Sequence, residues 1–286
     1  FFAQDPEFIE RFRREAKAVA NLSHPNIVPI YSYGEEGNHT YIAMQYVEGG
    51  TLKQSRGEVY RPDDALRLSL PIVKALAYAH QRGIVHRDIK PSNVLMSEGQ
   101  RPLLADFGLA KMVEASVQLT GTGVGMGTPA YMSPEQGEGK HVDRRTDIYS
   151  LGIMLYEMLT GDVPFRADTP MAVVIKHMTA PMPIPRSVNP NIPEVLERII
   201  LKATAKNPHD RYQSADEMAV ALESAQKALA NGRQLHGKNQ SAEVHSPLRQ
   251  RPSVAGSLRR LGQSVAVGIG IVLIVVILMR VFDVCL

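Results

Sequence analysis

Residues 84–108 constrain the fold more than any other part of the chain, because two polar clusters alternate there with short apolar runs. The stretch reads IVHRDIKPSNVLMSEGQRPLLADFG, and its apolar runs at 84–86, 93–96 and 102–105 are typical of short buried strands. Asp88 and Asp106 therefore belong to loops held by a rigid frame, where functional side chains usually lie.

The polar residues of this stretch form a chemically coherent set. Asn93 and Asp106 offer hard oxygen ligands of the kind that Mg²⁺ prefers, and Mg²⁺ takes few protein ligands beside substrate phosphates. Asp88 is a carboxylate that can orient a hydroxyl nucleophile, and Lys90 is a point charge for a phosphate. The set indicates phosphoryl transfer, in which positioning and charge neutralisation provide most of the catalysis.

HRDIKPSN followed by DFG resembles the catalytic and metal-binding loops of eukaryotic-like (Hanks-type) bacterial serine/threonine protein kinases. DFG begins thirteen residues after Asn93, and this combined spacing is far more specific than HRD alone. The resemblance implies an α+β, bilobal, protein-kinase-like fold with a partial small lobe and a mostly helical large lobe. The expected divisions are a small lobe at 1–47, a large lobe at 48–230, a basic disordered linker at 231–263 and a transmembrane helix at 264–282.

The same resemblance assigns roles in catalysis, with ATP and Mg²⁺ as cofactors. Asp88 would orient the substrate hydroxyl, Lys90 would steady the γ-phosphate, and Asn93 with Asp106 would hold the metal. An amphipathic helix is predicted over 5–21, and its Glu15 matches the family's partner for the lysine of strand three. Neither that lysine nor a glycine-rich loop precedes the helix, so we expect a chain that lacks the start of the small lobe.

Two β-rich runs, 28–33 and 41–47, predict a hairpin-like pair. The second run, within YIAMQYVEGGTL, resembles strand five and the hinge that receives adenine. The match implies that Met44 guards the back of the nucleotide pocket and that Gln45 and Val47 offer backbone groups to the purine. Leu95 is assigned to the same pocket by the resemblance.

The glycine-rich segment after DFG resembles the family's activation segment. Thr120 and Thr122 stand where similar bacterial kinases are phosphorylated, and a phosphate there would pair with Arg87 and order the loop. The segment ends in GTPAYMSPE, which resembles the loop that docks a peptide substrate. Its Thr128 matches the threonine that hydrogen-bonds the catalytic aspartate and lysine in serine/threonine-specific members.

Other matching residues would have structural roles. Asp147 would anchor the backbone of the catalytic loop, and Arg211 would form a buried ion pair with Glu135. His86 and Phe107 would belong to the stack of side chains that links the lobes.

Apolar periodicity and end signals predict further helices, over 61–82, 143–161, 170–179, 195–205 and 214–229. Ser214 and Glu217 have the spacing of a capping box at the start of the last helix. His80, near the end of the first, is expected to pack in the core, because no His or Cys partner lies at a metal-ligand spacing.

Charge and hydropathy at the end of the chain indicate a membrane anchor. Residues 232–263 are basic and have no apolar period, whereas 265–279 are uninterrupted apolar residues. Arg259 and Arg260 precede the apolar run, so the positive-inside rule places the kinase region in the cytoplasm and the C-terminus outside. The basic linker is expected to lie against anionic lipids.

Composition limits the partners and the redox chemistry. A net charge of +3 is too small to suggest a nucleic-acid partner, and the single cysteine, Cys285, excludes an internal disulfide framework. The expected partners are protein substrates with Ser or Thr hydroxyls, and a second copy of the chain for autophosphorylation.

Two alternatives stay open. One is a catalytically inactive, membrane-tethered binding module, either a pseudokinase or a truncated kinase, which the missing strand-three lysine favours. The other is a small-molecule phosphotransferase of related fold, which shares the aspartate-based metal chemistry but should lack GTPAYMSPE.

Overall fold

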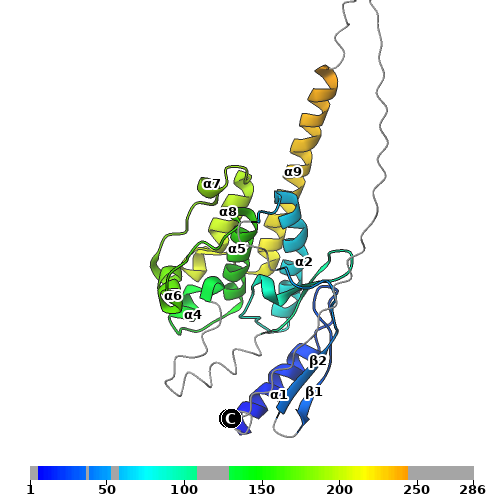
Figure 1. Ribbon diagram of the computed structural model, residues 1–286, viewed down its shortest axis with the longest axis vertical. Coiled ribbons are helices and arrows are strands. Elements are labelled where there is room, and N and C mark those ends of the chain that lie inside the picture. The colour runs from blue at the N-terminus through cyan, green and yellow to red at the C-terminus, as the bar shows by residue number, and fades with distance from the viewer. Residues whose placement is uncertain (1–5, 37–38, 53–57, 108–128, 244–286) are drawn as a thin grey trace, which may run out of the picture. The chain divides into compact units, whose positions relative to one another are not determined.

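The structure is a computed structural model that describes residues 6–36, 39–52, 58–107 and 129–243. The first described element is α1 (Pro6–Ala20), followed by the strands β1 (Ile30–Glu36) and β2 (His39–Met44). α1 buries Ala16 and Val19 on one face and packs against β1, as Figure 1 shows. The helix predicted over 5–21 is therefore confirmed.

β1 and β2 form the predicted antiparallel hairpin. Their register runs from Ile30 opposite Met44 to Glu36 opposite His39, with an irregularity between Ile30 and Ser32. A backbone hydrogen bond joins the two chain segments at the base of the hairpin: the Gln45 N–H donates to the Pro29 carbonyl at 2.9 Å.

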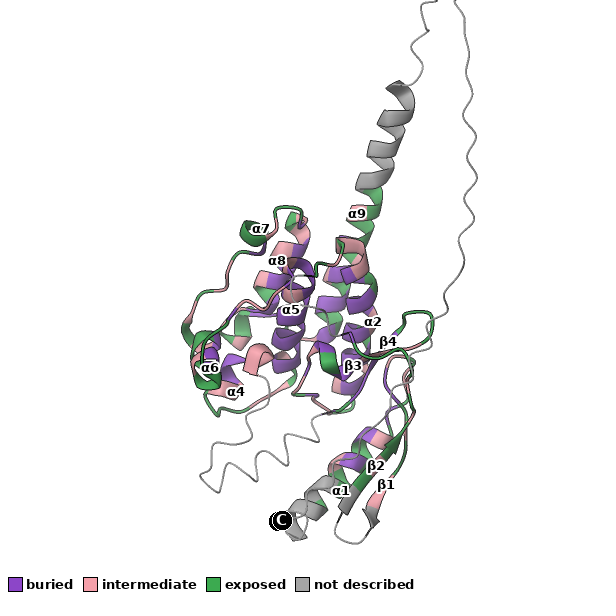
Figure 2. Ribbon diagram, in the orientation of Figure 1, coloured by how far each residue is buried: buried purple, intermediate pink, exposed green. Residues whose placement is uncertain are grey.

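Two long helices, α2 (Pro62–His80) and α5 (Arg144–Thr160), carry the main core. α5 is buried on nearly all sides, which is typical of a helix at the centre of a large core (Figure 2). Its ends are well defined: the Asp143 side chain accepts from the Arg145 N–H at 2.8 Å, and Gly161 closes the helix at φ 84°. These ends match the predicted helix over 143–161.

The remaining described elements are short, except the last. They are the strands β3 (Val94–Met96) and β4 (Pro102–Leu104), the 3-10 turns η2 (Pro91–Asn93), η3 (Pro129–Tyr131) and η4 (Pro208–Asp210), and the helices α4 (Pro134–Gly137), α6 (Pro170–Thr179), α7 (Pro185–Val188), α8 (Glu194–Ala203) and α9 (Ala215–Glu243). At the start of α9 the Ser214 hydroxyl accepts from the Glu217 N–H at 3.1 Å, but the Glu217 carboxylate accepts from the N–H of Gln213, one residue earlier than in a standard capping box.

Of the three strands predicted in the 84–108 stretch, the second and third are present as β3 and β4. The prediction of a first strand at 84–86 is wrong. β3 and β4 pair antiparallel, with Leu95 opposite Leu103. Residues 84–86 form no strand, because their backbone donors bind other partners: the Ile84 N–H donates to the Ala79 carbonyl and the His86 N–H donates to a side chain of α5. The apolar run reflects burial beside helices, a case that periodicity alone does not separate from a buried strand.

The predicted disordered linker also needs correction, because α9 continues through residues 231–243. This part has no apolar period and contains two glycines, Gly232 and Gly237, which disfavour helix, so neither periodicity nor intrinsic propensity predicts the extension of α9. The rest of the predicted linker and the predicted transmembrane helix at 264–282 lie outside the described residues. Within the described ranges, no helix is both long enough and apolar enough to cross a bilayer.

A glycine sets the distance between α5 and α8. A Cβ added at Gly152 would lie 2.8 Å from Thr204 Cγ2 and 2.9 Å from Ala203 Cβ. We therefore predict that Gly152→Ala lowers the free energy of unfolding by about 1–3 kcal/mol, because the two helices must move apart. Urea denaturation measures the change, and Thr204→Ser, which removes the Cγ2 methyl, should recover part of it. A neutral or stabilising Gly152→Ala would contradict the close packing.

Candidate active site

The backbone of the loop after α2 is held by one carboxylate of α5. Asp147 has a fully buried side chain, and its two oxygens accept the N–H groups of His86 at 2.8 Å and Arg87 at 2.7 Å. The predicted contact of Asp147 with this loop is therefore present. It matters because Arg87 has a φ of 66°, a left-handed conformation that disfavours residues with a Cβ.

A third donor, the ring of His80, reaches Asp147 from α2, a contact that the prediction of core packing for His80 does not include. His80 Nε2 lies 2.7 Å from Asp147 Oδ2, and only 5% of the His80 side chain is exposed. His80 does pack in the core, but it also forms a polar contact that orients Asp147. Its spacing in the sequence carried no signal for this contact, because the two residues are 67 positions apart.

Asp88 lies one residue beyond this anchor and is positioned by two side chains. Its Oδ2 atom forms an ion pair with Lys90 Nζ at 2.7 Å and accepts from Asn93 Nδ2 at 2.9 Å. Asn93 Nδ2 also donates to the Asp88 carbonyl at 2.8 Å, so the amide spans the loop. The structure thus brings together Asp88, Lys90 and Asn93, with about a fifth of the Asp88 and Lys90 side chains exposed.

Asn93 and Asp106 lie on neighbouring segments. The Ala105 N–H donates to the Asn93 carbonyl at 2.9 Å, and Asp106 follows at once with an exposed side chain and a φ of 58°. Asp is one of the few residues that adopt this conformation without glycine. Because the Asn93 amide nitrogen serves Asp88, its Oδ1 atom remains without a hydrogen-bond partner among the described residues. An amide oxygen and a nearby carboxylate suit a hard cation that keeps other oxygen ligands.

His86 links the two loops from the buried side. Its Nδ1 accepts from the Asp88 N–H at 3.2 Å, so its Nε2 carries the proton that is donated to the Ala105 carbonyl at 2.9 Å. Burial lowers the pKa of His86, which agrees with this neutral ring. The Phe107 ring packs against it with a centroid distance of 4.6 Å.

The residues assigned to a purine site lie on the β2 end and on β3. Val47 and Leu95 both pack against a small buried cluster formed by Val28, Leu103 and Ala105. Met44, at the end of β2, is 36% exposed. Because the Gln45 N–H already donates within the hairpin, only its carbonyl remains to receive a ligand donor.

Comparison with known proteins agrees with this arrangement. The family model "Protein kinase domain" matches residues 3–222. The chain belongs to the protein kinase domain family. It is 45% identical over 227 residues to serine/threonine-protein kinase PrkC of Bacillus subtilis, covering 78% of this chain and 35% of PrkC. It is 40% identical over 232 residues to serine/threonine-protein kinase PknL of Mycobacterium tuberculosis, covering 80% of this chain and 58% of PknL. The chain thus spans from about a third to just over half the length of these relatives.

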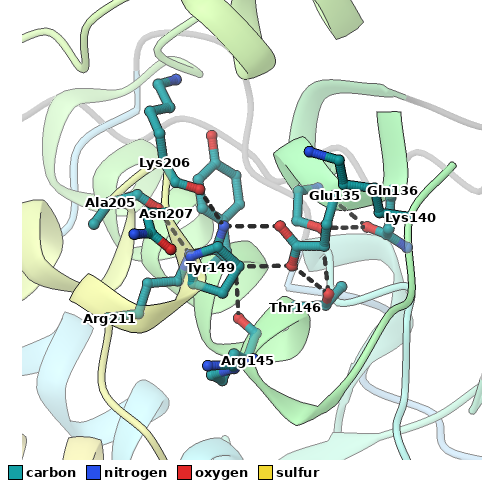
Figure 3. Close-up of polar contacts among 12 residues, drawn as sticks. Glu135, Gln136, Lys140, Arg145, Thr146, Tyr149, Ala205, Lys206, Asn207 and Arg211 are labelled. Atoms are coloured by element: carbon teal, nitrogen blue, oxygen red, sulfur yellow. Dashed lines mark hydrogen bonds and ion pairs between the residues drawn. The ribbon is translucent and has the colours of Figure 1, made fainter. Parts of the chain in front are cut away.

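The kinase domain contains the predicted buried ion pair (Figure 3). Arg211 Nη1 and Nη2 each lie 2.8 Å from one oxygen of Glu135, and the Arg211 side chain is fully buried. Its remaining donors reach the carbonyls of Ala205, Arg145 and Lys206 at 2.7–3.1 Å. Burial alone would raise the pKa of Glu135, but hydrogen bonds from Arg211 and Thr146 outweigh it and lower that pKa.

A second polar contact continues from this pair toward α6. The Arg211 guanidinium lies over the Tyr149 ring at 4.8 Å, and the Tyr149 hydroxyl is 2.9 Å from His177 Nδ1. His177 is fully buried, and burial followed by repulsion from Lys206 lowers its pKa from 6.5 to about 4. Lys206 Nζ in turn donates to the His177 carbonyl at 2.7 Å.

Other predicted positions cannot be placed in the site. Thr120, Thr122 and Thr128 lie outside the described residues. Glu15 lies on α1 with a partly exposed side chain, and Arg87 is exposed, while its carbonyl accepts from Gln136 Nε2 at 2.9 Å. The roles assigned to these residues stay predictions.

We predict that Arg211→Met destabilises the domain by about 3–5 kcal/mol, because it leaves the Glu135 carboxylate buried without its counter-charge. Chemical denaturation at pH 7 measures the loss. Arg198→Met is the matched control, since Arg198 forms an exposed pair with Glu194 and should change stability by at most about 1 kcal/mol. Equal effects of the two substitutions would contradict the structural role of the buried pair.

The depressed pKa of His177 predicts a pH dependence. Between about pH 4 and 6.5 the unfolded chain binds a proton at this residue and the folded chain does not, so its contribution to stability is complete above pH 6.5 and is lost on acidification. The resulting slope is up to about 1.4 kcal/mol per pH unit. His177→Asn should flatten the measured slope of unfolding free energy over this range. An unchanged slope would contradict a neutral, buried His177.

Proposed function

We propose that the chain is a serine/threonine protein kinase that transfers the γ-phosphate of ATP to protein Ser and Thr hydroxyls. The observation that carries this proposal is the position of Asp88. Its carboxylate is oriented by Lys90 and Asn93, on a loop whose backbone is held by Asp147. A carboxylate fixed in this way can accept a hydrogen bond from a substrate hydroxyl and direct it toward a phosphate.

The chain's own residues fit ATP and Mg²⁺ as cofactors. Asn93 Oδ1 and the Asp106 carboxylate would hold the metal, and Mg²⁺ bound to few protein ligands would neutralise charge on the phosphates. Lys90, now paired with Asp88, would steady the γ-phosphate beside the hydroxyl. The carbonyl of Gln45 and the backbone of Val47 would receive the purine, with Leu95 and Met44 lining its pocket.

Protein substrates are favoured by the segment that leads into α4. η3 and α4 contact α6 and α5, and the Tyr131 carbonyl accepts from Ser150 Oγ at 2.7 Å. Because these contacts fix the position of η3 and α4, the two elements can present a defined surface to an extended peptide. The relatives named as serine/threonine-protein kinases and the position of Thr128 in the sequence support Ser/Thr specificity.

Sequence features outside the described residues extend the proposal to the regulation of the kinase and to its location in the cell. Phosphorylation of Thr120 or Thr122 by a second copy of the chain would create a charge for Arg87. The predicted helix at 264–282 contains the apolar run 265–279 and follows basic residues, which supports a single-pass anchor with the kinase domain in the cytoplasm and the C-terminus outside. Residues 244–263 would then lie near anionic lipids.

We predict that Asp88→Asn lowers the phosphorylation rate about 10²–10⁴-fold, because the amide cannot accept the hydroxyl proton. The measurement is transfer of labelled phosphate from ATP with Mg²⁺, to a peptide and to the chain itself. It should be made on the chain as printed and on a version extended by the upstream coding sequence. Asp168→Asn, at an exposed position, is the matched control and should retain full activity.

The outcomes separate the open alternatives. Labelling of Thr120 or Thr122 that requires Asp88 supports the kinase. Labelling of a small alcohol but of no peptide would favour a small-molecule phosphotransferase. If no version labels or binds nucleotide, the kinase proposal fails and a binding module becomes the better account.

A further inference from the structure

Gln136, in α4, joins the segment proposed to bind peptide to the loop that carries Asp88. Its Nε2 atom donates to the Arg87 carbonyl at 2.9 Å, although the two residues are 49 positions apart. Its Oε1 atom accepts from the Ser133 N–H at 3.1 Å, at the start of the same helix. One amide therefore bridges two elements that the proposed reaction uses for different purposes, peptide binding and orientation of the substrate hydroxyl.

The chemistry of its two partners fixes the direction of this amide. A backbone N–H only donates and a carbonyl only accepts, so the amide oxygen must face Ser133 and the NH₂ group must face Arg87. The reversed amide would place two donors together at one end and two acceptors together at the other, and both hydrogen bonds would be lost. Gln136 therefore offers Arg87 a donor that a carboxylate of the same shape could not offer.

The Arg87 carbonyl belongs to the peptide group that leads into Asp88. Asp147 accepts the N–H groups of His86 and Arg87, which lie in the two preceding peptide groups. The next peptide group is held at its oxygen by Gln136. Its N–H, which belongs to Asp88, donates to His86 Nδ1 at 3.2 Å. Because a peptide group is planar, contacts at its oxygen and at its N–H together fix its rotation, and with it the backbone from which the Asp88 side chain extends.

This peptide group needs support because Arg87 has a φ of 66°. A residue other than glycine keeps a left-handed conformation only where the surrounding contacts hold it there. Asp147 supplies one such contact before the Cα atom of Arg87, and Gln136 supplies another after it. Loss of the second contact would let the ψ angle of Arg87 relax even while the first stays in place, and Asp88 would move with it.

α4 is itself fixed on both sides of Gln136. Glu135 precedes Gln136 and forms the buried ion pair with Arg211 (Figure 3). Gly137 follows it and lies so close to α6 that an added Cβ would be 2.7 Å from Val174 Cγ1. The amide is thus presented from an element whose neighbours restrict its movement, so its hydrogen bond can hold the loop in one position.

We propose that Gln136 is a positioning residue for Asp88. Its Nε2 donor sets the orientation of the peptide group from which the Asp88 carboxylate reaches a substrate hydroxyl. The effect of Gln136 on phosphoryl transfer rests on the proposed kinase activity, whereas its effect on the backbone of the loop does not.

Two substitutions separate this role from a role in capping α4. Gln136→Glu keeps an oxygen for the Ser133 N–H but replaces the donor toward Arg87 with a second oxygen, whereas Gln136→Met removes both groups. Hydrogen exchange measured by NMR should show the Asp88 amide exchanging about tenfold faster in both variants, the effect of losing one hydrogen bond. The buried amides of α5 should change much less, because the lost contact is local. Gln226→Glu, at an exposed position of α9, is the matched control and should leave the Asp88 amide at the wild-type rate.

Two results of this comparison would overturn the proposal. One is a wild-type exchange rate for the Asp88 amide in Gln136→Glu, even if Gln136→Met exchanged faster, because capping of α4 would then explain the effect. The other is an equal increase at Asp88 and in α5, because that result indicates general destabilisation of the domain.

Transfer of labelled phosphate from ATP to a peptide gives the second readout. Gln136→Glu should lower kcat about tenfold and leave the KM for ATP unchanged, since Asp88 would orient the hydroxyl and not the purine. A wild-type kcat in this variant would also overturn the proposal. If the wild type transfers no phosphate, the proposed kinase activity fails, and the exchange comparison still decides whether Gln136 positions Asp88.

Discussion

The arrangement of the site depends on one buried carboxylate, Asp147. It lies in the first turn of α5 and accepts three hydrogen bonds, from the backbone of His86 and Arg87 and from the ring of His80. If the loop moved away, the buried Asp147 carboxylate would lose these donors and its charge would be uncompensated. Such a movement therefore has a high free-energy cost. This constraint holds Arg87 in a left-handed conformation and thereby sets the position of Asp88.

A second buried charge connects the large helices to the segment proposed to bind peptide. Glu135 lies at the start of α4, and Arg211 lies just before α9, 76 residues away. All the donors of Arg211 are used, since it binds both Glu135 oxygens and three backbone carbonyls. Such full pairing is what makes a buried ion pair tolerable, whereas an exposed pair such as Arg198–Glu194 adds little.

Both charges act through α5, the helix with the most complete burial. Asp147 faces the loop, Thr146 donates to Glu135 at 2.5 Å, and the Arg145 carbonyl accepts from Arg211. Arg145, Thr146 and Asp147 thus contribute to two hydrogen-bond networks. This is possible because successive side chains of a helix point in different directions. Displacement of α5 would alter the proposed catalytic loop and the proposed docking segment together.

Local sequence patterns predicted most elements well. The signals at 170–179, a proline at the first position and an apolar stripe, gave the bounds of α6, and Asp143 and Gly161 marked the ends of α5. The patterns failed in segments whose secondary structure does not follow from the spacing of their apolar residues. Residues 84–86 are apolar but their backbone N–H groups bind helix groups, and residues 231–243 are helical although they lack an apolar period and contain two glycines.

The sequence by itself determined the chemistry of the site, because HRDIKPSN and DFG place Asp88, Lys90, Asn93 and Asp106 within a short span whose local turns bring them together. Only the tertiary structure decided which distant groups hold that span. His80 contacts Asp147 and Arg144 contacts the segment before α9 because helix packing brings them together, and no spacing along the chain encodes these contacts. Short-range geometry follows from local sequence, whereas burial and long-range pairing depend on how the helices pack.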